Sequence, residues 1–148
     1  MNHSDSKATR GLSFIEHIVV LSAASVVLTG TYAWTGNYLV RQKVTEALAE
    51  AEWAKVAVKI TCSENPAIQS LSNEQAGVGL VRSQYVGNID LGGSCLQPRI
   101  SIETINTGLP VQPILTINGN LSLESRQVTW ICTTDGLDVH VPLECRKS

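Results

Sequence analysis

Charged residues are scarce in this chain of 148 residues, and one long stretch has none. Lys, Arg, Asp and Glu make up 16% of the sequence, the net charge is −2, and no charged residue occurs from Ile18 to Val40. A small negative net charge provides no basic field that would attract nucleic acid to the whole molecule. At about 1.5 Å per helical residue, the uncharged stretch is long enough to cross a hydrocarbon core of about 30 Å.

The sequence also lacks the motifs of catalysis and of cofactor binding. Its histidines, His3, His17 and His140, are scattered, and no nucleophile elbow, glycine-rich phosphate loop or paired acidic cluster accompanies them. We therefore expect no enzyme and no cofactor. Asp135 and Asp138 lie near His140 in the sequence, but a solvated loop is a better interpretation of this segment than a metal site.

The four cysteines are widely spaced. They are Cys62, Cys95, Cys132 and Cys145, and none belongs to a C-x-x-C pair. This spacing argues against a zinc site and against thioredoxin-like redox chemistry. An even number of separated cysteines favours disulfides in an exported chain. Four cysteines allow three pairings, and these observations do not choose among them.

The N-terminal segment combines a basic leader with an apolar run that contains one acid. Residues 1–11 are polar and carry two basic residues, which keeps this end cytoplasmic by the positive-inside rule. Glu16 lies inside the apolar run that begins at Leu12, and an ionisable group in a membrane segment indicates a function and a partner. The Ser22–Ser25 segment is a poor signal-peptidase site because apolar residues follow it, which leaves an uncleaved signal anchor as one alternative.

Residues 37–59 predict an amphipathic helix. Apolar residues recur at helical spacing and are expected to pack on a sheet: Val44, Leu48, Ala51, Ala54 and Val58. The charged residues between them are expected to form a solvated face: Arg41, Lys43, Glu46, Glu50, Glu52, Lys55 and Lys59.

The remaining sequence predicts a long connection and then a sheet. Residues 63–94 lack a clear period, apart from a short strand at Tyr85–Val86 and a break at Gly92–Gly93, so they predict a long exposed connection. Strand-like alternation follows at 100–103, 114–117, 121–123 and 127–132, and Asn118–Gly119 predicts a tight turn. We expect an α+β fold, in which a long N-terminal helix with a membrane-spanning half and an amphipathic half packs on a three- or four-stranded antiparallel sheet.

The segment from Gly11 to Glu16 resembles the class III signal of type IV pilins, in which Gly precedes Phe-Thr-Leu-Ile-Glu. The resemblance implies that a prepilin peptidase cuts after Gly11 and methylates the new amino terminus at Leu12, which replaces the usual Phe. It places Glu16 on the family's glutamate, and a buried carboxylate is tolerated when an opposite charge, here the amine of a neighbouring subunit, neutralises it. His17 departs from the family pattern, and it either stays neutral or shares the hydrogen bonding of Glu16.

Two further segments are similar to type IV pilins. The residues that match are Asn37, Tyr38 and Arg41 before the Ala-rich helix, and Trp130 and Pro142 in the C-terminal segment, each shortly before a Cys. The family's C-terminal disulfide loop implies a Cys132–Cys145 bridge. Some pilins have a second bridge, which would join Cys62 to Cys95 here. Ala33 stands where many pilins have Pro, although Gly30 and Gly36 could loosen the helix.

The resemblance implies a domain organisation and a function. Residues 1–11 would be a cleaved leader, 12–40 a transmembrane and assembly helix, and 41–148 the globular pilin domain. The chain would wait in the bacterial inner membrane and then form an extracellular pilus filament that serves adhesion, twitching motility, biofilm formation or DNA uptake. Its partners would be copies of itself, the prepilin peptidase and the inner-membrane assembly machinery, with minor pilins, DNA or a host surface as further candidates.

Two alternatives stay open at this point. The first is a minor pilin that binds DNA for natural transformation, for which Arg126, Arg146 and Lys147 are the candidate cations. The second is a pseudopilin of a type II secretion system, which shares the N-terminal signal but commonly lacks the terminal disulfide loop, so Cys132 and Cys145 count against it.

Overall fold

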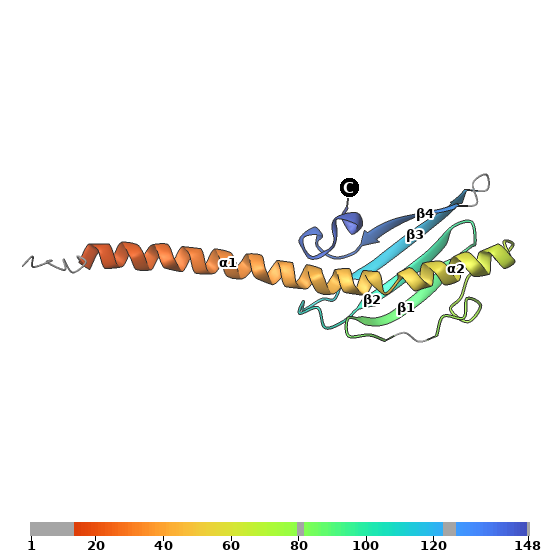
Figure 1. Cartoon of the computed structure of the whole chain (residues 1–148), viewed down its shortest axis with the longest axis horizontal. Coiled ribbons are helices and arrows are strands. Elements are labelled where there is room, and N and C mark those ends of the chain that lie inside the picture. Colours follow the sequence, from red (N-terminus) through yellow and green to blue (C-terminus); the bar gives the residue numbers. More distant parts are fainter. Residues whose placement is uncertain (1–13, 80–81, 123–126, 148) are drawn as a thin grey trace, which may run out of the picture. The chain divides into compact units, whose positions relative to one another are not determined.

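The described residues form two helices, a four-stranded sheet and two short 3₁₀ turns, whose arrangement is drawn in Figure 1. The computed structural model describes residues 14–79, 82–122 and 127–147. The elements are α1 (Phe14–Ala49), α2 (Glu52–Glu64), β1 (Val86–Gly93), β2 (Pro98–Thr104), β3 (Ile114–Ser122), β4 (Gln127–Thr134), η1 (Asp138–His140) and η2 (Leu143–Cys145). The chain divides into two compact units, Met1–Gly36 and Asn37–Ser148, which are described separately.

The first unit contributes residues 14–36 of α1. Every side chain from residue 14 to residue 26 is exposed, and the apolar Phe14 and Val26 are 80% and 71% exposed. Within the described ranges, no helix is both long enough and apolar enough to span a membrane. The membrane-spanning half of the helix therefore stays a prediction.

In the second unit, the predicted amphipathic helix is interrupted once. The Ala51 amide donates to the Leu48 carbonyl at 3.1 Å, three residues back, and this tighter turn separates α1 from α2. The five residues predicted to pack on the sheet are all buried: Val44, Leu48, Ala51, Ala54 and Val58. The amphipathic pattern is thus confirmed, although one helix was expected and two are present.

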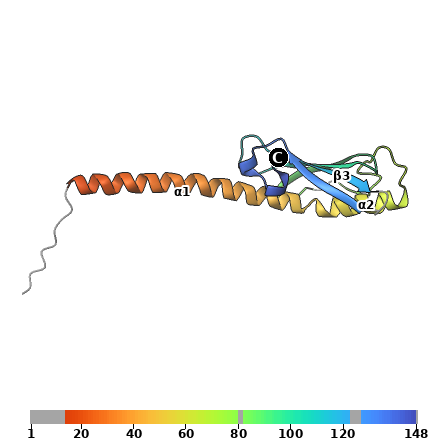
Figure 2. The same ribbon diagram turned by 90° about the horizontal axis from the view of Figure 1, so that it is seen from above.

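The four strands form one antiparallel sheet in the order β1-β2-β3-β4. Viewed from above, α2 and the sheet form two layers (Figure 2). The apolar side chains that the sheet buries beneath the helices alternate along β1, β2 and β3: Ile89, Leu91, Ile100, Ile102, Leu115 and Ile117. Each is worth about 1.5–3 kcal/mol when fully buried. The predicted α+β class, with a helix layer on an antiparallel sheet, is confirmed.

The prediction of a mere connection at residues 83–94 is wrong, because the first full strand lies there. Ile89 and Leu91 of β1 are buried and alternate with the outward-facing Asp90, which is the period of a strand. Glycines at both ends mask this period in the sequence. Gly87 sits where the β1–β2 register shifts, and Gly93 has the left-handed φ of 75° at which β1 ends.

The prediction of a tight turn at Asn118–Gly119 is also wrong. Both residues lie in the middle of β3, where Asn118 pairs with Ile131 and Gly119 with Trp130. The structure needs Gly at position 119 for a different reason, which is close packing. A Cβ there would lie 2.7 Å from Pro98 Cγ and 2.7 Å from the Trp130 ring.

The connection between α2 and β1 covers the outer edge of β1. The Asn73 side chain bonds this edge as a neighbouring strand would, since its Nδ2 donates to the Ile89 carbonyl at 2.7 Å and its Oδ1 accepts from the Leu91 amide at 2.6 Å. The Leu71 amide donates to the Gly93 carbonyl at 2.7 Å, and the Leu71 side chain is buried. The segment is therefore a fixed edge cover instead of a freely exposed loop.

We predict that Gly119→Ala destabilises the globular unit by about 1–3 kcal/mol, because the added methyl overpacks the contact between Pro98 and Trp130. The measurement is the unfolding free energy of the protein in denaturant, followed by tryptophan fluorescence. Gly79→Ala is the matched control, since nothing lies within 4 Å of a Cβ at that position. Equal stability of the two variants would show that Gly119 is not needed for close packing.

Candidate assembly and display surfaces

The structure describes only part of the predicted processing and assembly site. Gly11 and Leu12, the predicted cleavage and methylation residues, lie outside the described residues. Glu16 lies in the first turn of α1, where a carboxylate is favourable to the helix dipole, and it is exposed like its neighbour His17. Phe14 and Ile15 beside it are 80% and 71% exposed. An isolated chain thus presents a carboxylate on an apolar surface that lacks cover.

Two disulfides fasten the globular unit, and they have the pairing that the pilin resemblance implies. Cys62 at the end of α2 bonds Cys95, which follows β1, and Cys132 in β4 bonds Cys145 in η2. The second bond closes residues 132–145 into a loop, which we call the disulfide loop. In the chain-entropy account, a closure of this size stabilises the fold by about 3 kcal/mol.

Arg41 holds the disulfide loop against the helix. Its guanidinium donates to the Val139 carbonyl from Nε at 3.3 Å and from Nη2 at 2.9 Å. One turn earlier, the side-chain oxygen of Asn37 lies 3.2 Å from His140 Nε2. Arg41 was predicted to lie on a solvated face; it is half-buried, and its bonds to Val139 give it a structural role that the prediction did not include. The spacing of Asn37 and Arg41, which matches the pilin pattern, could have indicated this shared role, since residues four apart lie on one helix face.

The two aspartates of the disulfide loop accept hydrogen bonds from backbone amides. Asp135 Oδ1 accepts from the Ile114 amide at 2.7 Å, and Asp138 Oδ1 accepts from the Lys147 amide at 3.2 Å. In the part of the chain that the structure describes, no three side chains of metal-binding type come together. The Asp135 and Asp138 carboxylates therefore help to fix the conformation of the loop.

Lys43 fixes a second loop, the one between β2 and β3. Its ammonium donates to the carbonyls of Asn106 and Thr107, each at 3.3 Å, and lies 5.8 Å from the centroid of the Tyr85 ring. Asn106 adopts a left-handed φ of 55°, which the loop requires. The charge pattern predicted only a solvated lysine, because nothing in the local sequence pairs it with a loop 63 residues away.

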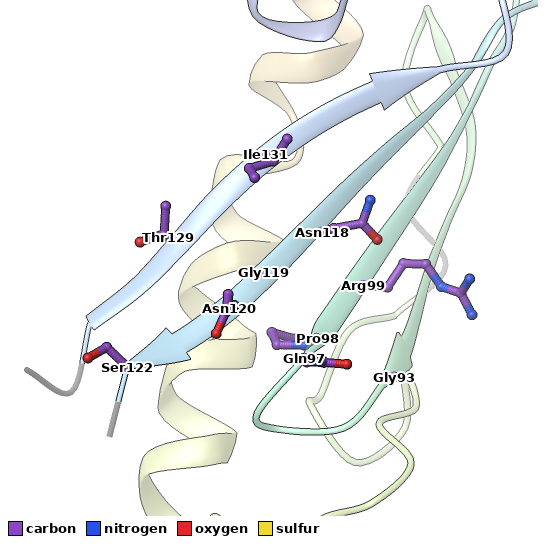
Figure 3. A pocket seen from close by; sticks show the side chains of 10 residues that line it. All are labelled: Gly93, Gln97, Pro98, Arg99, Asn118, Gly119, Asn120, Ser122, Thr129 and Ile131. Atoms are coloured by element: carbon purple, nitrogen blue, oxygen red, sulfur yellow. The ribbon is translucent and has the colours of Figure 1, made fainter. Parts of the chain in front are cut away.

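The sheet face opposite the helices is polar and slightly hollowed (Figure 3). The hollow lies across β2, β3 and β4, and its described lining residues are Gly93, Gln97, Pro98, Arg99, Asn118, Gly119, Asn120, Ser122, Thr129 and Ile131. Only Arg99 among them is charged, and Ile131 is 63% exposed. Short amides and hydroxyls thus cover the outward face.

A comparison with known protein families matches residues 40–146 to the family described as Pilin (bacterial filament). The chain belongs to the pilin family. The match begins at the amphipathic half of α1 and ends beyond Cys145, so it includes the sheet and the disulfide loop. The helix on an antiparallel sheet and the paired cysteines are consistent with a type IV pilin. As a pilin, the chain is a structural subunit of a bacterial filament.

We predict that Arg41→Gln loosens the disulfide loop of this pilin, because the Val139 carbonyl loses its two charged hydrogen bonds. The expected loss is about 1 kcal/mol, or about fivefold faster hydrogen exchange at the His140 amide, which bonds within the loop. Gln42→Ala is the control, since the Gln42 side-chain amide donates to the Tyr38 hydroxyl on its own helix. Unchanged exchange in Arg41→Gln would refute the anchoring role.

Proposed function

We propose that this pilin is made as a precursor, is cut between Gly11 and Leu12, and is held by residues 12–40 in the inner membrane until it joins the filament. In the filament, Glu16 of one subunit pairs with the methylated Leu12 amine of a neighbour. The observation that carries this proposal is the exposed carboxylate among exposed apolar side chains at the start of α1.

The apolar exposure in the first unit supports burial by other subunits. Besides Phe14 and Ile15, the strongly exposed apolar side chains are Ile18, Val19, Val20, Leu21 and Val26. A contiguous apolar surface of this kind indicates an interaction site or a membrane. Both environments exclude water, so a carboxylate there requires a counter-charge.

The residue types of this segment support an α-amine as that counter-charge. Among the described residues 14–26, no side chain is Lys or Arg, and the one basic side chain is His17, which lies next to Glu16 of its own helix. A neighbouring helix of the same kind therefore offers no Lys or Arg at this level. Cleavage after Gly11 would create one positive charge per subunit at Leu12, and Glu16 would be the fifth residue of the mature chain. Pairing between neighbours then sets the axial register of the helices.

The globular unit is proposed to supply the outer surface of the filament. The disulfide loop carries three exposed apolar side chains, Leu137, Val139 and Leu143, at 67%, 49% and 76% exposure. The cations proposed for DNA binding do not form an observed cluster, since Arg126 lies outside the described residues and Arg146 is half-buried. We therefore favour adhesion, twitching motility or biofilm formation over DNA capture as the filament's role.

We predict that Glu16→Gln and Glu16→Ala leave leader cleavage intact and abolish assembly, because the neighbour's amine loses its counter-charge. Mass spectrometry of membrane protein would show methylated Leu12 as the first residue in both variants, whereas sheared surface fractions would contain no filaments. Ser22→Ala is the control, because the Ser22 hydroxyl bonds its own helix at the Val19 carbonyl. Normal filaments in Glu16→Gln would rule out charge pairing.

A further inference from the structure

The two edge strands of the sheet differ in how many of their outward-facing backbone groups are hydrogen-bonded. On β1, three outward-facing backbone groups are bonded by Asn73 and Leu71: the Ile89 carbonyl, the Leu91 amide and the Gly93 carbonyl. On β4, the opposite edge, the backbone bonds among the described residues give no comparable cover. In Figure 1, β4 lies at the margin of the sheet and the C-terminal segment stands at one end of it.

The register identifies the groups that β4 leaves open. The Asp135 amide donates to the Ile114 carbonyl, so the hydrogen-bonded pairs of β3 and β4 are those in phase with it, including Ile131 with Asn118 and Thr129 with Asn120. Val128 and Trp130 alternate with these hydrogen-bonded residues and therefore direct their N–H and C=O groups away from the sheet. Together they offer two donors and two acceptors on one edge.

The composition of β4 favours another strand at this edge. Its sequence, Gln-Val-Thr-Trp-Ile-Cys-Thr-Thr, contains no charged residue, no Pro and no Gly, and most of its residues favour strands. Natural sheets usually protect an open edge with a charge, a Pro, a bulge or a covering segment. The disulfide loop is joined to β4 at Cys132. Within the described part of the chain, residues 127–131 carry no charge, Pro or bulge, and no backbone bond from a covering segment reaches them.

We propose that residues 127–131 of β4 pair antiparallel with the same residues of a second copy of this chain. A two-fold axis at Thr129 places Val128 opposite Trp130 of the partner copy. The four open groups of each copy then pair with those of the other copy in four reciprocal hydrogen bonds. The uncharged strand adds no repulsion between copies, and the exposed Ile131 side chains extend the contact on the outer face. The result is one continuous sheet across two subunits.

The symmetry of this contact distinguishes it from filament growth. A two-fold contact uses the same patch on both copies and closes on itself, whereas a helical filament grows through different patches. If the proposed function holds, and the sheets lie on the filament surface, the β4 edge would join neighbouring filaments side by side. The pairing itself depends only on the globular unit, so it can be tested without filaments.

The test uses the full chain in detergent micelles, which cover the apolar helix, and measures mass by sedimentation equilibrium. We expect a concentration-dependent dimer for the wild type and loss of that dimer in Thr129→Lys and Thr129→Glu, because like charges then face each other across the axis. An equimolar mixture of the two variants should recover the dimer as a mixed pair. Asn118→Lys, on the same exposed face but one strand inward, should dimerise like the wild type.

Amide hydrogen exchange identifies the contact. In the dimer, the Val128 and Trp130 amides should exchange slowly, and in Thr129→Lys they should exchange fast. The Thr129 and Ile131 amides bond β3 and should be protected in both, which also shows that the variant is folded. A wild type that stays monomeric, or a dimer that survives in Thr129→Lys, would overturn the proposal. Either result leaves the role of Glu16 in assembly unaffected.

Discussion

The close packing of the second half of α1, together with α2, on one face of the sheet is the contact on which the rest of the structure depends. Small side chains permit it, because Ala47, Ala51 and Ala54 are fully buried and let the helix backbone approach the strands. The facing side of the sheet contributes a layer of Ile and Leu side chains. Once this face is fixed, the positions of the disulfide loop and of the β2–β3 loop follow from Arg41 and Lys43 on the flanks of the same helix.

This arrangement separates the surfaces that hold the subunit together from those left for partners. The sheet buries one side of the amphipathic helix, whereas Val56 and Ile60 on α2 stay 56% and 53% exposed. In the first unit, the apolar side chains of residues 14–26 have no cover from the described chain. In the proposed filament, this apolar helix surface would be buried by other subunits, as expected of a protein that polymerises.

The sequence allowed the helix and its buried face to be predicted, because Val44 to Val58 repeat with a helical period that burial on a sheet requires. It also predicted three of the strands and, through the pilin resemblance, the disulfide pairing. β1 was not predicted because its glycines interrupt the alternating pattern. A turn was wrongly predicted at Asn118–Gly119, because Gly is needed at position 119 for close packing against Trp130 and not for a turn. The roles of Asn73, Arg41 and Lys43 depend on contacts between distant segments, which no local period encodes.

The central claim is that assembly buries the start of α1 and neutralises Glu16 with a neighbour's amine. A cryo-electron-microscopy reconstruction of filaments sheared from cells tests it most directly. The account predicts that residues 14–26 lie in the filament core, that the sheets lie outside, and that the Glu16 carboxylate is within about 4 Å of a Leu12 amino group on another subunit. A filament whose subunits retain residues 1–11, or whose Glu16 faces solvent, would contradict it.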